Sequence, residues 1–331
     1  MITAAHERGR RGVLSIGECM VELARRNDAT FQIAYGGDTF NTAAYLKRLI
    51  SDPVAYVTAV GDDPYSQGII DAAAANGVDT DFIAEVADRM PGLYLIETTY
   101  GERSFWYWRD RAPAREMFEH VDVEAVRTAA TQCALIYLSG ITLSILDNRG
   151  RATLSDILQS ARAAGALIAM DSNYRPRGWP GELSATRQTF ADFWRLTDLA
   201  LPTFDDEQAL WGDQSPAEAL ERLSELGVCE MVIKCGPGGA VTSTRQTSDT
   251  DDRTTAMVPC PALVTPIDTT AAGDSFNAAY LAARLTHQQP KQAATFAHTF
   301  ACRVINHRGA IIPEDATADL VQAFRNTRTR T

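Results

Sequence analysis

From about residue 133 onward, short apolar runs alternate with segments whose apolar residues recur at helical spacing. The elements expected there are strands at Ala134–Leu138, Leu167–Met170, Leu199–Leu201 and Met231–Lys234 and a helix over about Arg151–Ala164. Continuously apolar strands between helices indicate a mainly parallel sheet that is covered by helices on both faces. The pattern predicts an α/β fold that binds ligands at the carboxyl ends of its strands, where Asp171, Thr203 and Gly236 follow their runs.

The first third of the chain has a different pattern, in which strands carry one polar face. Such strands are expected at Val21–Ala24, Leu93–Glu97 and Ser104–Arg109. A hairpin turn is expected at Gly101-Glu102, and the strands interrupt a βα pattern around Ala55–Gly61. We therefore predict a small antiparallel sheet, called the lid, with strands at about 18–35 and 92–110, that projects from the main body.

Charge and composition indicate which partners and which cell compartment to expect for this protein. The formal net charge is −11, which disfavours nucleic acid as a partner. No apolar run reaches the roughly 18 residues that a membrane span needs, so no membrane partner is expected. The six cysteines form no CxxC pair, as expected for reduced thiols in a cytoplasmic protein. Residues 1–12 are expected to form a disordered tail before one domain over 13–331, and Ser243–Thr255 an exposed hairpin or loop.

The strongest chemical signal is Asp268–Phe276, which reads DTTAAGDSF. Small residues precede a helix with an apolar face, so the backbone N–H groups of about residues 271–274 point into free space. Such a helix N-terminus binds anions and stabilises charge on a transferring phosphoryl group. Asp274, in the first turn, is placed to take a proton from an attacking hydroxyl. The alternative is an acidic residue that only stabilises the helix dipole.

A second glycine run, Lys234–Ala240, follows a predicted strand. It lacks the pattern GxxxxGK[ST], and no GxGxxG opens a helix after the first strand. Both absences disfavour a P-loop or a dinucleotide-binding fold. Taken by itself, the run is also typical of an ordinary turn.

Two segments carry a resemblance to a known family. Asp268–Asp274 resembles the C-terminal signature of the ribokinase family of carbohydrate kinases, also called the phosphofructokinase B family. Gly36–Ala43, which reads GGDTFNTA, resembles its N-terminal signature. The resemblance covers nearly everything after the tail and implies a ribokinase-like fold that uses ATP and Mg²⁺. It implies Asp274 as the catalytic base and an anion hole of Ala271, Ala272 and Gly273, and it leaves a monovalent-cation requirement open.

The resemblance also implies a nucleotide site, with His298 beside the nucleotide base. The implied ATP-binding residues are Asn173, Arg175, Thr203, Lys234, Gly236, Gly238, Gly239, Ala271, Ala272, Gly273 and His298. Ala271 replaces a residue that is commonly glycine, and its methyl group is tolerable if φ is negative. Thr203 and Asp206 stand where many members carry Asn and Glu, so Asp206 is a candidate for contact with magnesium through phosphate or water.

Aromatic and basic residues suggest an anionic substrate. Along Phe105–Arg109, strand alternation places Phe105, Tyr107 and Arg109 on one face and Trp106 and Trp108 on the other. Arg175 follows a core strand, and its planar guanidinium suits a carboxylate, as does that of Arg109. The alternative for Arg109 is a solvated strand residue or a surface ion pair. The alternative for the two tryptophans is burial against another layer.

The combined motifs resemble the 2-keto-3-deoxygluconate kinases of this family. The matching pieces are Gly17–Glu22, Gly92–Tyr94, Tyr107–Arg109, Asn173–Arg177, Asp205–Glu207 and Ala209–Gly212. The residues implied to bind the sugar acid are Gly37, Asp38, Asn41, Tyr94, Tyr107, Arg109, Arg175 and Asp274. The expected function is ATP-dependent phosphorylation of 2-keto-3-deoxygluconate to 2-keto-3-deoxy-6-phosphogluconate.

Two alternatives to that function stay open. One is a kinase for a neutral sugar such as fructose or ribose, which would leave Arg109 and Arg175 without an anionic partner. The other is a sugar-binding relative without activity, which the presence of Asp274 and Gly273 disfavours. A small antiparallel sheet cannot easily bury both faces, so we also expect a homo-oligomer that forms through the Trp106/Trp108 face of the lid.

Overall fold

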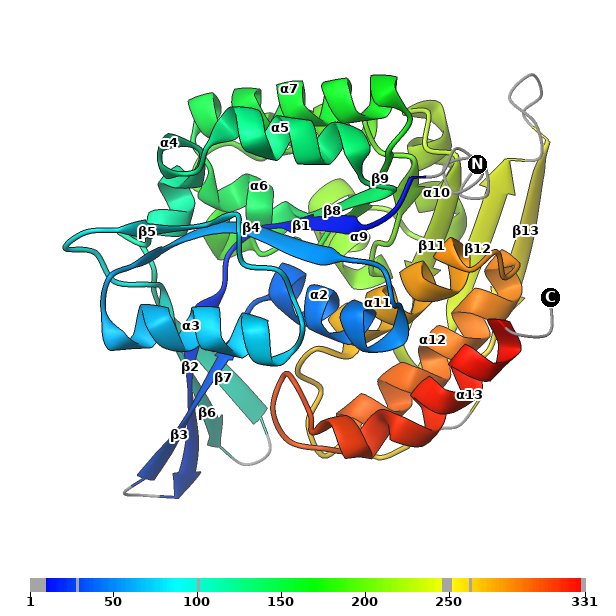
Figure 1. Ribbon diagram of the computed structural model, residues 1–331. Helices are drawn as coiled ribbons and strands as arrows, with labels where there is room; N and C mark the ends of the chain where they lie inside the picture. The colour runs from blue at the N-terminus through cyan, green and yellow to red at the C-terminus, as the bar shows by residue number, and fades with distance from the viewer. Residues whose placement is uncertain (1–9, 28–29, 100–101, 246–251, 262–263, 329–331) are drawn as a thin grey trace.

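The computed structural model describes residues 10–27, 30–99, 102–245, 252–261 and 264–328. The main body has a large central sheet with helices on both faces, and a second, smaller sheet projects from one end (Figure 1). The predicted α/β architecture, with helices on both faces of a mainly parallel sheet and a smaller projecting sheet, is therefore confirmed. In the described part of the chain, no helix is both long and apolar enough to span a membrane.

The central sheet has nine strands. In sheet order they are β13 (Arg253–Val258), β12 (Ala240–Arg245), β11 (Glu230–Lys234), β10 (Leu199–Ala200), β9 (Leu167–Asp171), β8 (Leu135–Ser139), β1 (Val13–Ile16), β4 (Val54–Gly61) and β5 (Ile83–Val86). The pairs from β5 to β11 are parallel, whereas β11–β12 and β12–β13 are antiparallel. Strands β1, β8, β9 and β11 are buried along their whole length, which explains their continuously apolar sequences.

Each face of the sheet packs against its own hydrophobic cluster. The helices on one face are α2 (Asp38–Leu49), α3 (Pro64–Ala75), α11 (Ala272–Leu285), α12 (Pro290–Ile305) and α13 (Ala318–Arg328). Those on the other are α4 (Met117–His120), α5 (Val123–Gln132), α6 (Gly140–Ile145), α7 (Asn148–Ala164), α8 (Leu183–Trp194), α9 (Phe204–Trp211) and α10 (Pro216–Glu225). Single 3₁₀ turns are η1 (Pro113–Glu116), η2 (Pro176–Gly178), η3 (Gly236–Gly238) and η4 (Glu314–Thr317).

Local sequence signals fix several of these helix ends. The side chains of Asp122 and Asp147 accept hydrogen bonds from free amides in the first turns of α5 and α7. Helix α7 ends at Gly165, which adopts φ 98°. Glycine reaches this left-handed conformation without the steric cost of a Cβ. These signals set where each helix begins and ends, whereas the buried faces decide where it packs.

The lid is a four-stranded sheet built from two hairpins. Its order is β3 (Thr30–Gly36), β2 (Met20–Asn27), β6 (Leu93–Thr99) and β7 (Glu102–Trp108). Each hairpin is antiparallel, and the two are joined by parallel pairing of β2 with β6. The strands lie at about the predicted ranges 18–35 and 92–110, and β3 ends at Gly36, one residue beyond the first range. Gly101 of the predicted turn lies outside the described residues, and Glu102 is the first residue of β7.

Two boundaries differ in detail from the sequence predictions. Residues 1–9 lie outside the described range, but Gly12, expected within the tail, already accepts a hydrogen bond at 2.9 Å from the amide of Ala134. The segment expected to be an exposed hairpin or loop at Ser243–Thr255 contains the ends of the antiparallel strands β12 and β13. Ser243 itself is buried, because its strand lies between two others.

Candidate active site

The N-terminus of α11 carries the predicted anion hole. The preceding loop is held by Asp268, whose carboxylate accepts from the amides of Thr270 (2.8 Å) and Gly309 (2.9 Å). The amide of Ala272 donates to the carbonyl of Thr269 at 3.2 Å, so it is already engaged. The first helical turn leaves the next amides, those of Gly273 and Asp274, without an intrahelical acceptor. Of the predicted anion-hole residues Ala271, Ala272 and Gly273, Ala272 is therefore the one whose amide is already used, and the amide of Asp274 is a further candidate.

The structure corrects the expectation for Ala271. This residue has φ 58° and ψ 18°, in the left-handed region, and not the negative φ that would make its methyl group free of strain. A left-handed non-glycine residue costs about 1 kcal/mol or more. The turn into α11 demands this conformation, which explains why glycine suits the position better. The strain falls on the loop that presents the free amides.

Asp274 lies in the first turn of α11 and faces α2. Its Oδ2 accepts a hydrogen bond from Asn41 Nδ2 at 2.8 Å, and its carbonyl accepts from the Thr42 hydroxyl at 3.3 Å. Burial, followed by the negative charge of Asp38, raises the pKa of Asp274 to about 8. A carboxyl group with this pKa is a stronger base than an ordinary aspartate. The position and the pKa both suit a general base, beyond a role in stabilising the helix dipole.

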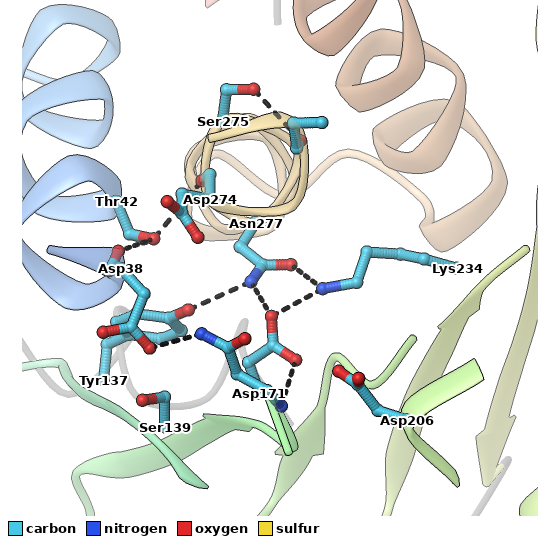
Figure 2. A network of polar contacts seen from close by, with 12 residues as sticks. Asp38, Thr42, Tyr137, Ser139, Asp171, Asp206, Lys234, Asp274, Ser275 and Asn277 are labelled. Carbon is cyan, nitrogen blue, oxygen red and sulfur yellow. Dashed lines mark hydrogen bonds and ion pairs between the residues drawn. The ribbon is translucent and has the colours of Figure 1, made fainter. Parts of the chain in front are cut away.

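Asp38 and Asn173 meet beside this base. Asp38 opens α2, and its Oδ2 accepts from Asn173 Nδ2 at 2.6 Å. Burial raises the pKa of Asp38, and hydrogen bonds from Ser139 and Asn173 oppose that rise. Figure 2 shows Asp38 of α2 and Asp274 of α11 next to each other. Asn173, which was implied to contact ATP, thus contacts a predicted sugar-binding residue.

A buried set of polar contacts below Asp274 joins β8, β9, β11 and α11 (Figure 2). Lys234, the last residue of β11, donates to Asp171 Oδ2 at 2.6 Å and to Asn277 Oδ1 at 2.9 Å. Asn277 Nδ2 donates to Asp171 Oδ2 at 2.6 Å and to the Tyr137 hydroxyl at 3.0 Å. Lys234 was a predicted ATP-binding residue, but the sequence reasoning gave no role to Asn277. A polar residue among the apolar positions of α11 was the signal available for it.

Arg175 and Asp206 form an ion pair at the edge of the site. The guanidinium NH1 donates to Asp206 Oδ1 at 3.0 Å and to the carbonyl of Tyr174 at 2.8 Å. Burial raises the pKa of Asp206 to about 6, and the charge of Arg175 opposes that rise. Thr203, at the start of α9, forms a bridge to Lys234 and so lies beside the buried set. Arg175, Asp206, Thr203 and Lys234 are therefore brought to one edge of the sheet.

The glycine run follows β11 as a short turn. Gly236 has φ 53° and Gly239 φ 97°, and a Cβ on Gly239 would lie 2.3 Å from the carbonyl oxygen of Val258. Gly238 is the last residue of η3, a single turn with the sequence GPG. The glycines therefore serve the local turn whether or not a nucleotide binds there.

His298 lies on α12 and is buried. Its ring packs edge-on against Phe276 of α11, with ring centroids 4.9 Å apart. Burial lowers its pKa, which favours the neutral imidazole. Its Nε2 has no hydrogen-bond partner in the described part of the molecule. The structure thus packs His298 against α11, the helix whose first turn is the predicted anion site.

The lid contributes the aromatic and basic residues. Tyr94 and Tyr107 face each other across β6 and β7 with ring centroids 6.0 Å apart. The Tyr94 hydroxyl donates to Glu22, and Arg109 pairs with the buried carboxylate of Glu18. The ion pair expected as the alternative for Arg109 is thus present, but its partner is buried. Arg109 Nε has no partner among the described residues, so one donor stays available.

Glycines connect the lid to the base. A Cβ on Gly36 would lie 3.0 Å from the Tyr94 hydroxyl and 3.4 Å from Asn41 Oδ1. Asn41 is the residue that binds Asp274, so the lid tyrosine and the base lie at one continuous site. A Cβ on Gly37 would lie 2.0 Å from the carbonyl oxygen of Glu18. The glycine pair therefore lets β2, β3 and the start of α2 come together.

This arrangement agrees with comparisons to known proteins. Residues 10–317 match the model of the pfkB family carbohydrate kinases. The chain belongs to this family. It is 41% identical over 314 residues to the 2-dehydro-3-deoxygluconokinase of Dickeya dadantii strain 3937, covering 92% of this chain and 98% of that protein. The Haemophilus influenzae protein of the same name is 39% identical over 313 residues, covering 93% and 98%.

Solved structures share the fold of this pfkB-family kinase. The 2-dehydro-3-deoxygluconokinase from Thermotoga maritima matches with a TM-score of 0.75 at 21% identity, covering 95% of this chain and 98% of that one. A putative ribokinase II from E. coli, in complex with ATP and Mg²⁺, matches with a TM-score of 0.78 at 22% identity, covering 96% and 99%. The predicted family and fold are confirmed, and the individual residue roles stay predictions.

Proposed function

We propose that this carbohydrate kinase transfers the γ-phosphoryl group of ATP to the terminal hydroxyl of 2-keto-3-deoxygluconate, giving 2-keto-3-deoxy-6-phosphogluconate. The observation that carries the proposal is the 41% identity, across nearly the whole of both chains, to a 2-dehydro-3-deoxygluconokinase. The geometry supports it, because a carboxyl group with a raised pKa lies beside free helix amides and opposite the lid tyrosines. A base and an anion site are what phosphoryl transfer to an alcohol needs.

Several residues of this chain have separate roles in the proposed phosphoryl transfer. Asp274 takes the proton of the attacking hydroxyl, and Asn41 orients its carboxylate. The amides of Gly273 and Asp274 stabilise the charge on the transferred group. The lid covers the substrate and excludes water, which limits wasteful ATP hydrolysis. Tyr94 and Tyr107 form the lid wall of the sugar subsite.

Magnesium fits this site as a partner of the nucleotide and not as a caged ion. No group of three His, Cys, Asp or Glu side chains that could hold a metal ion occurs in the described residues. Asp206, whose pKa is raised to about 6, is a single carboxylate at the phosphate edge and already pairs with Arg175. It would contact the ion through water or phosphate, and the bound ion neutralises charge on the nucleotide phosphates.

The anion of the substrate is assigned to Arg109 and Arg175. Arg109 keeps an unpaired Nε donor on the lid, and Arg175 lies at the opposite edge with its side chain 54% exposed. A carboxylate binds guanidinium groups through charge-assisted hydrogen bonds. The pairing of these arginines with Glu18 and Asp206 also supports the neutral-sugar alternative, because their charges are already balanced.

An ADP-release assay over a panel of carbohydrates distinguishes a sugar-acid kinase from a neutral-sugar kinase. The panel contains 2-keto-3-deoxygluconate, gluconate, fructose and ribose at equal concentrations with saturating Mg²⁺ and ATP. We expect kcat/KM to be highest for the ketodeoxy acid. A preference for fructose or ribose would refute the sugar-acid assignment and leave the kinase assignment standing.

We also propose that two copies associate through the outer face of the lid. Trp106 and Trp108 are 53% and 60% exposed, so no other layer of the described part of the chain covers them. A groove of about 620 Å³ adjoins them, and its apolar lining includes Val21, Leu23, Ile33, Met90, Leu93 and Trp108. An exposed apolar surface of this kind, rimmed by polar residues, is typical of an association site.

Substitution of both tryptophans tests this interface. Trp106→Glu/Trp108→Glu should convert a dimer to a monomer at micromolar concentration, because it places charge in an apolar contact. Sedimentation velocity measures the change, and Met257→Glu, an exposed apolar position on β13, is the control that should stay dimeric. A wild-type protein that sediments as a monomer at these concentrations would refute the interface.

A further inference from the structure

The buried set around Lys234 contains a charge that no predicted role explains completely. Lys234, Asp171 and Asn277 are 6%, 4% and 0% exposed. They come from β11, β9 and α11, and Figure 2 shows their side chains converging below Asp274. Burying an ion pair is weak evidence for stability, because desolvation offsets most of the attraction. A buried lysine at a site for phosphoryl transfer therefore calls for a functional account.

Asn277 fixes the geometry of this lysine. Its Nδ2 donates to both Tyr137 and Asp171, and its Oδ1 accepts from the Lys234 ammonium. An ammonium group has no acceptor capacity, so the amide cannot be reversed without losing these bonds. Asp171 holds the same ammonium from the sheet. The lysine is thus clamped between a strand and the helix that carries the predicted base.

The clamp leaves the ammonium beside the anion site. Lys234 Nζ lies 3.7 Å from the point where a Cβ on Gly273 would be, so the absence of a side chain at Gly273 opens a direct approach. Two of the three N–H donors of Lys234 are used by Asp171 and Asn277 in the described structure. The third donor is available to a ligand at the free amides of α11.

We propose that Asp171 and Asn277 are positioning residues for phosphoryl transfer, which hold the Lys234 ammonium beside Gly273 so that it neutralises charge on the transferred group. This inference rests on the proposed kinase function but not on the identity of the sugar. In the step, the bond from the γ-phosphorus to the bridging oxygen of ADP breaks as a bond to the substrate oxygen forms. The hydroxyl proton goes to Asp274, and Lys234 takes no part in the proton transfer.

A double-mutant cycle tests whether Asn277 acts through Lys234. Lys234→Met should lower kcat by about 10²–10³-fold, as loss of a preorganised donor does, with the KM for the sugar changed less than threefold. Asn277→Leu, which keeps a similar volume, should lower kcat by about 10–10²-fold. In the Lys234→Met background, Asn277→Leu should cost less than twofold more, because the group that it positions is already absent.

A matched control separates positioning from packing. Arg284 and Glu230 form another buried ion pair between α11 and β11, at the end of the strand away from Asp274. Arg284→Met should lower the melting temperature but leave kcat within about twofold in assays run well below that temperature. Asp171→Asn should behave like Asn277→Leu in kcat. A structural role would instead make all these variants lose stability and keep kcat.

The outcomes of these experiments decide whether Asn277 positions Lys234. Equal losses from Asn277→Leu in the wild-type and Lys234→Met backgrounds would overturn the positioning role and leave the kinase function intact. The same holds if Asn277→Leu keeps full kcat. A wild-type protein that phosphorylates no carbohydrate would overturn both the proposed function and this inference. The cycle is run with whichever sugar the wild type prefers, so an error about the substrate does not affect it.

Discussion

Asp274 and the residues around Lys234 lie inside the main body and are held by several short hydrogen bonds from different elements, whereas the lid is a projecting sheet whose two tryptophans are exposed. The phosphate end is therefore organised before any ligand arrives. The lid touches it mainly through Tyr94, Glu18 and the glycine pair at the start of α2. If the proposed roles hold, charge stabilisation lies in the part of the molecule that several elements hold in place, and substrate selection lies in the lid, which can change with little cost to the core.

Asp274→Asn should have the largest effect on turnover, because it removes the predicted general base. Loss of a general base lowers kcat by about 10²–10⁴-fold. The fold and the helix amides persist, so ATP binding should stay nearly intact. Turnover assays and ATP titration by calorimetry measure the two properties, with Asp319→Asn on the exposed face of α13 as the control. Near-normal kcat in Asp274→Asn would remove this residue from its assigned role.

Arg109→Ala and Arg175→Ala should weaken the use of a sugar acid much more than the use of a neutral sugar. Hydrogen bonds to a charged group are worth about 1.5–3 kcal/mol, so each variant should lose about one to two powers of ten in kcat/KM for the sugar acid. The kcat/KM for a neutral analogue should fall little in either variant. Arg109, on the lid, should act mainly through KM, and Arg175 partly through kcat.

Arg109→Ala needs a companion variant, because it leaves the buried carboxylate of Glu18 without its ion-pair partner Arg109. Arg109→Ala/Glu18→Gln removes both charges and keeps the lid free of an unpaired ion. If the double variant regains full selectivity for the acid, the loss in the single variant came from the lid and not from anion binding. Full acid selectivity in Arg109→Ala and Arg175→Ala themselves would also contradict the assignment.

The pH dependence of kcat/KM should reflect the raised pKa of the base. Asp274 acts only when deprotonated, so kcat/KM should rise with pH up to about pH 8. The charged groups that face it are Asp38, Asp171 and Lys234, and the hydroxyls of Tyr45 and Tyr137 also lie near. A profile that is already flat at pH 6 would contradict the raised pKa.

The same pKa predicts an effect on stability. The folded protein holds a proton that the unfolded chain releases, so stability is lost as the pH rises from about 4 through about 8. Asp274→Asn does not titrate, and the difference in stability between this variant and the wild type should shift in favour of the variant by roughly 4 kcal/mol between pH 5 and pH 9. Melting temperatures at the two pH values test this, and a constant difference would count against it.

The smallest effect is expected at Ala271. Ala271→Gly removes the strain of a left-handed alanine at φ 58° and should stabilise the fold by about 0.5–1 kcal/mol. Chemical denaturation measures the change, and the activity should stay within about twofold. A destabilised variant would mean that the entropy of the unfolded chain outweighs the strain.

The sequence by itself determined the fold class, the lid and the main chemical groups. Apolar runs at strand length predicted the central sheet because strands buried on both faces have no polar side. The small-residue run before α11 marked the anion site because phosphate can approach a backbone only where side chains are small. Motifs of this kind are local, so one stretch of chain contains all the information.

Only the tertiary structure decided how distant groups meet. Asn277 is a single amide in an apolar helix, and its role depends on Asp171 and Lys234, which lie 106 and 43 residues away. The raised pKa of Asp274 arises from burial and from Asp38 on another helix. The left-handed turn at Ala271 follows from how the loop enters α11. Burial, charge proximity and backbone strain depend on three-dimensional packing, which no local pattern of residues specifies.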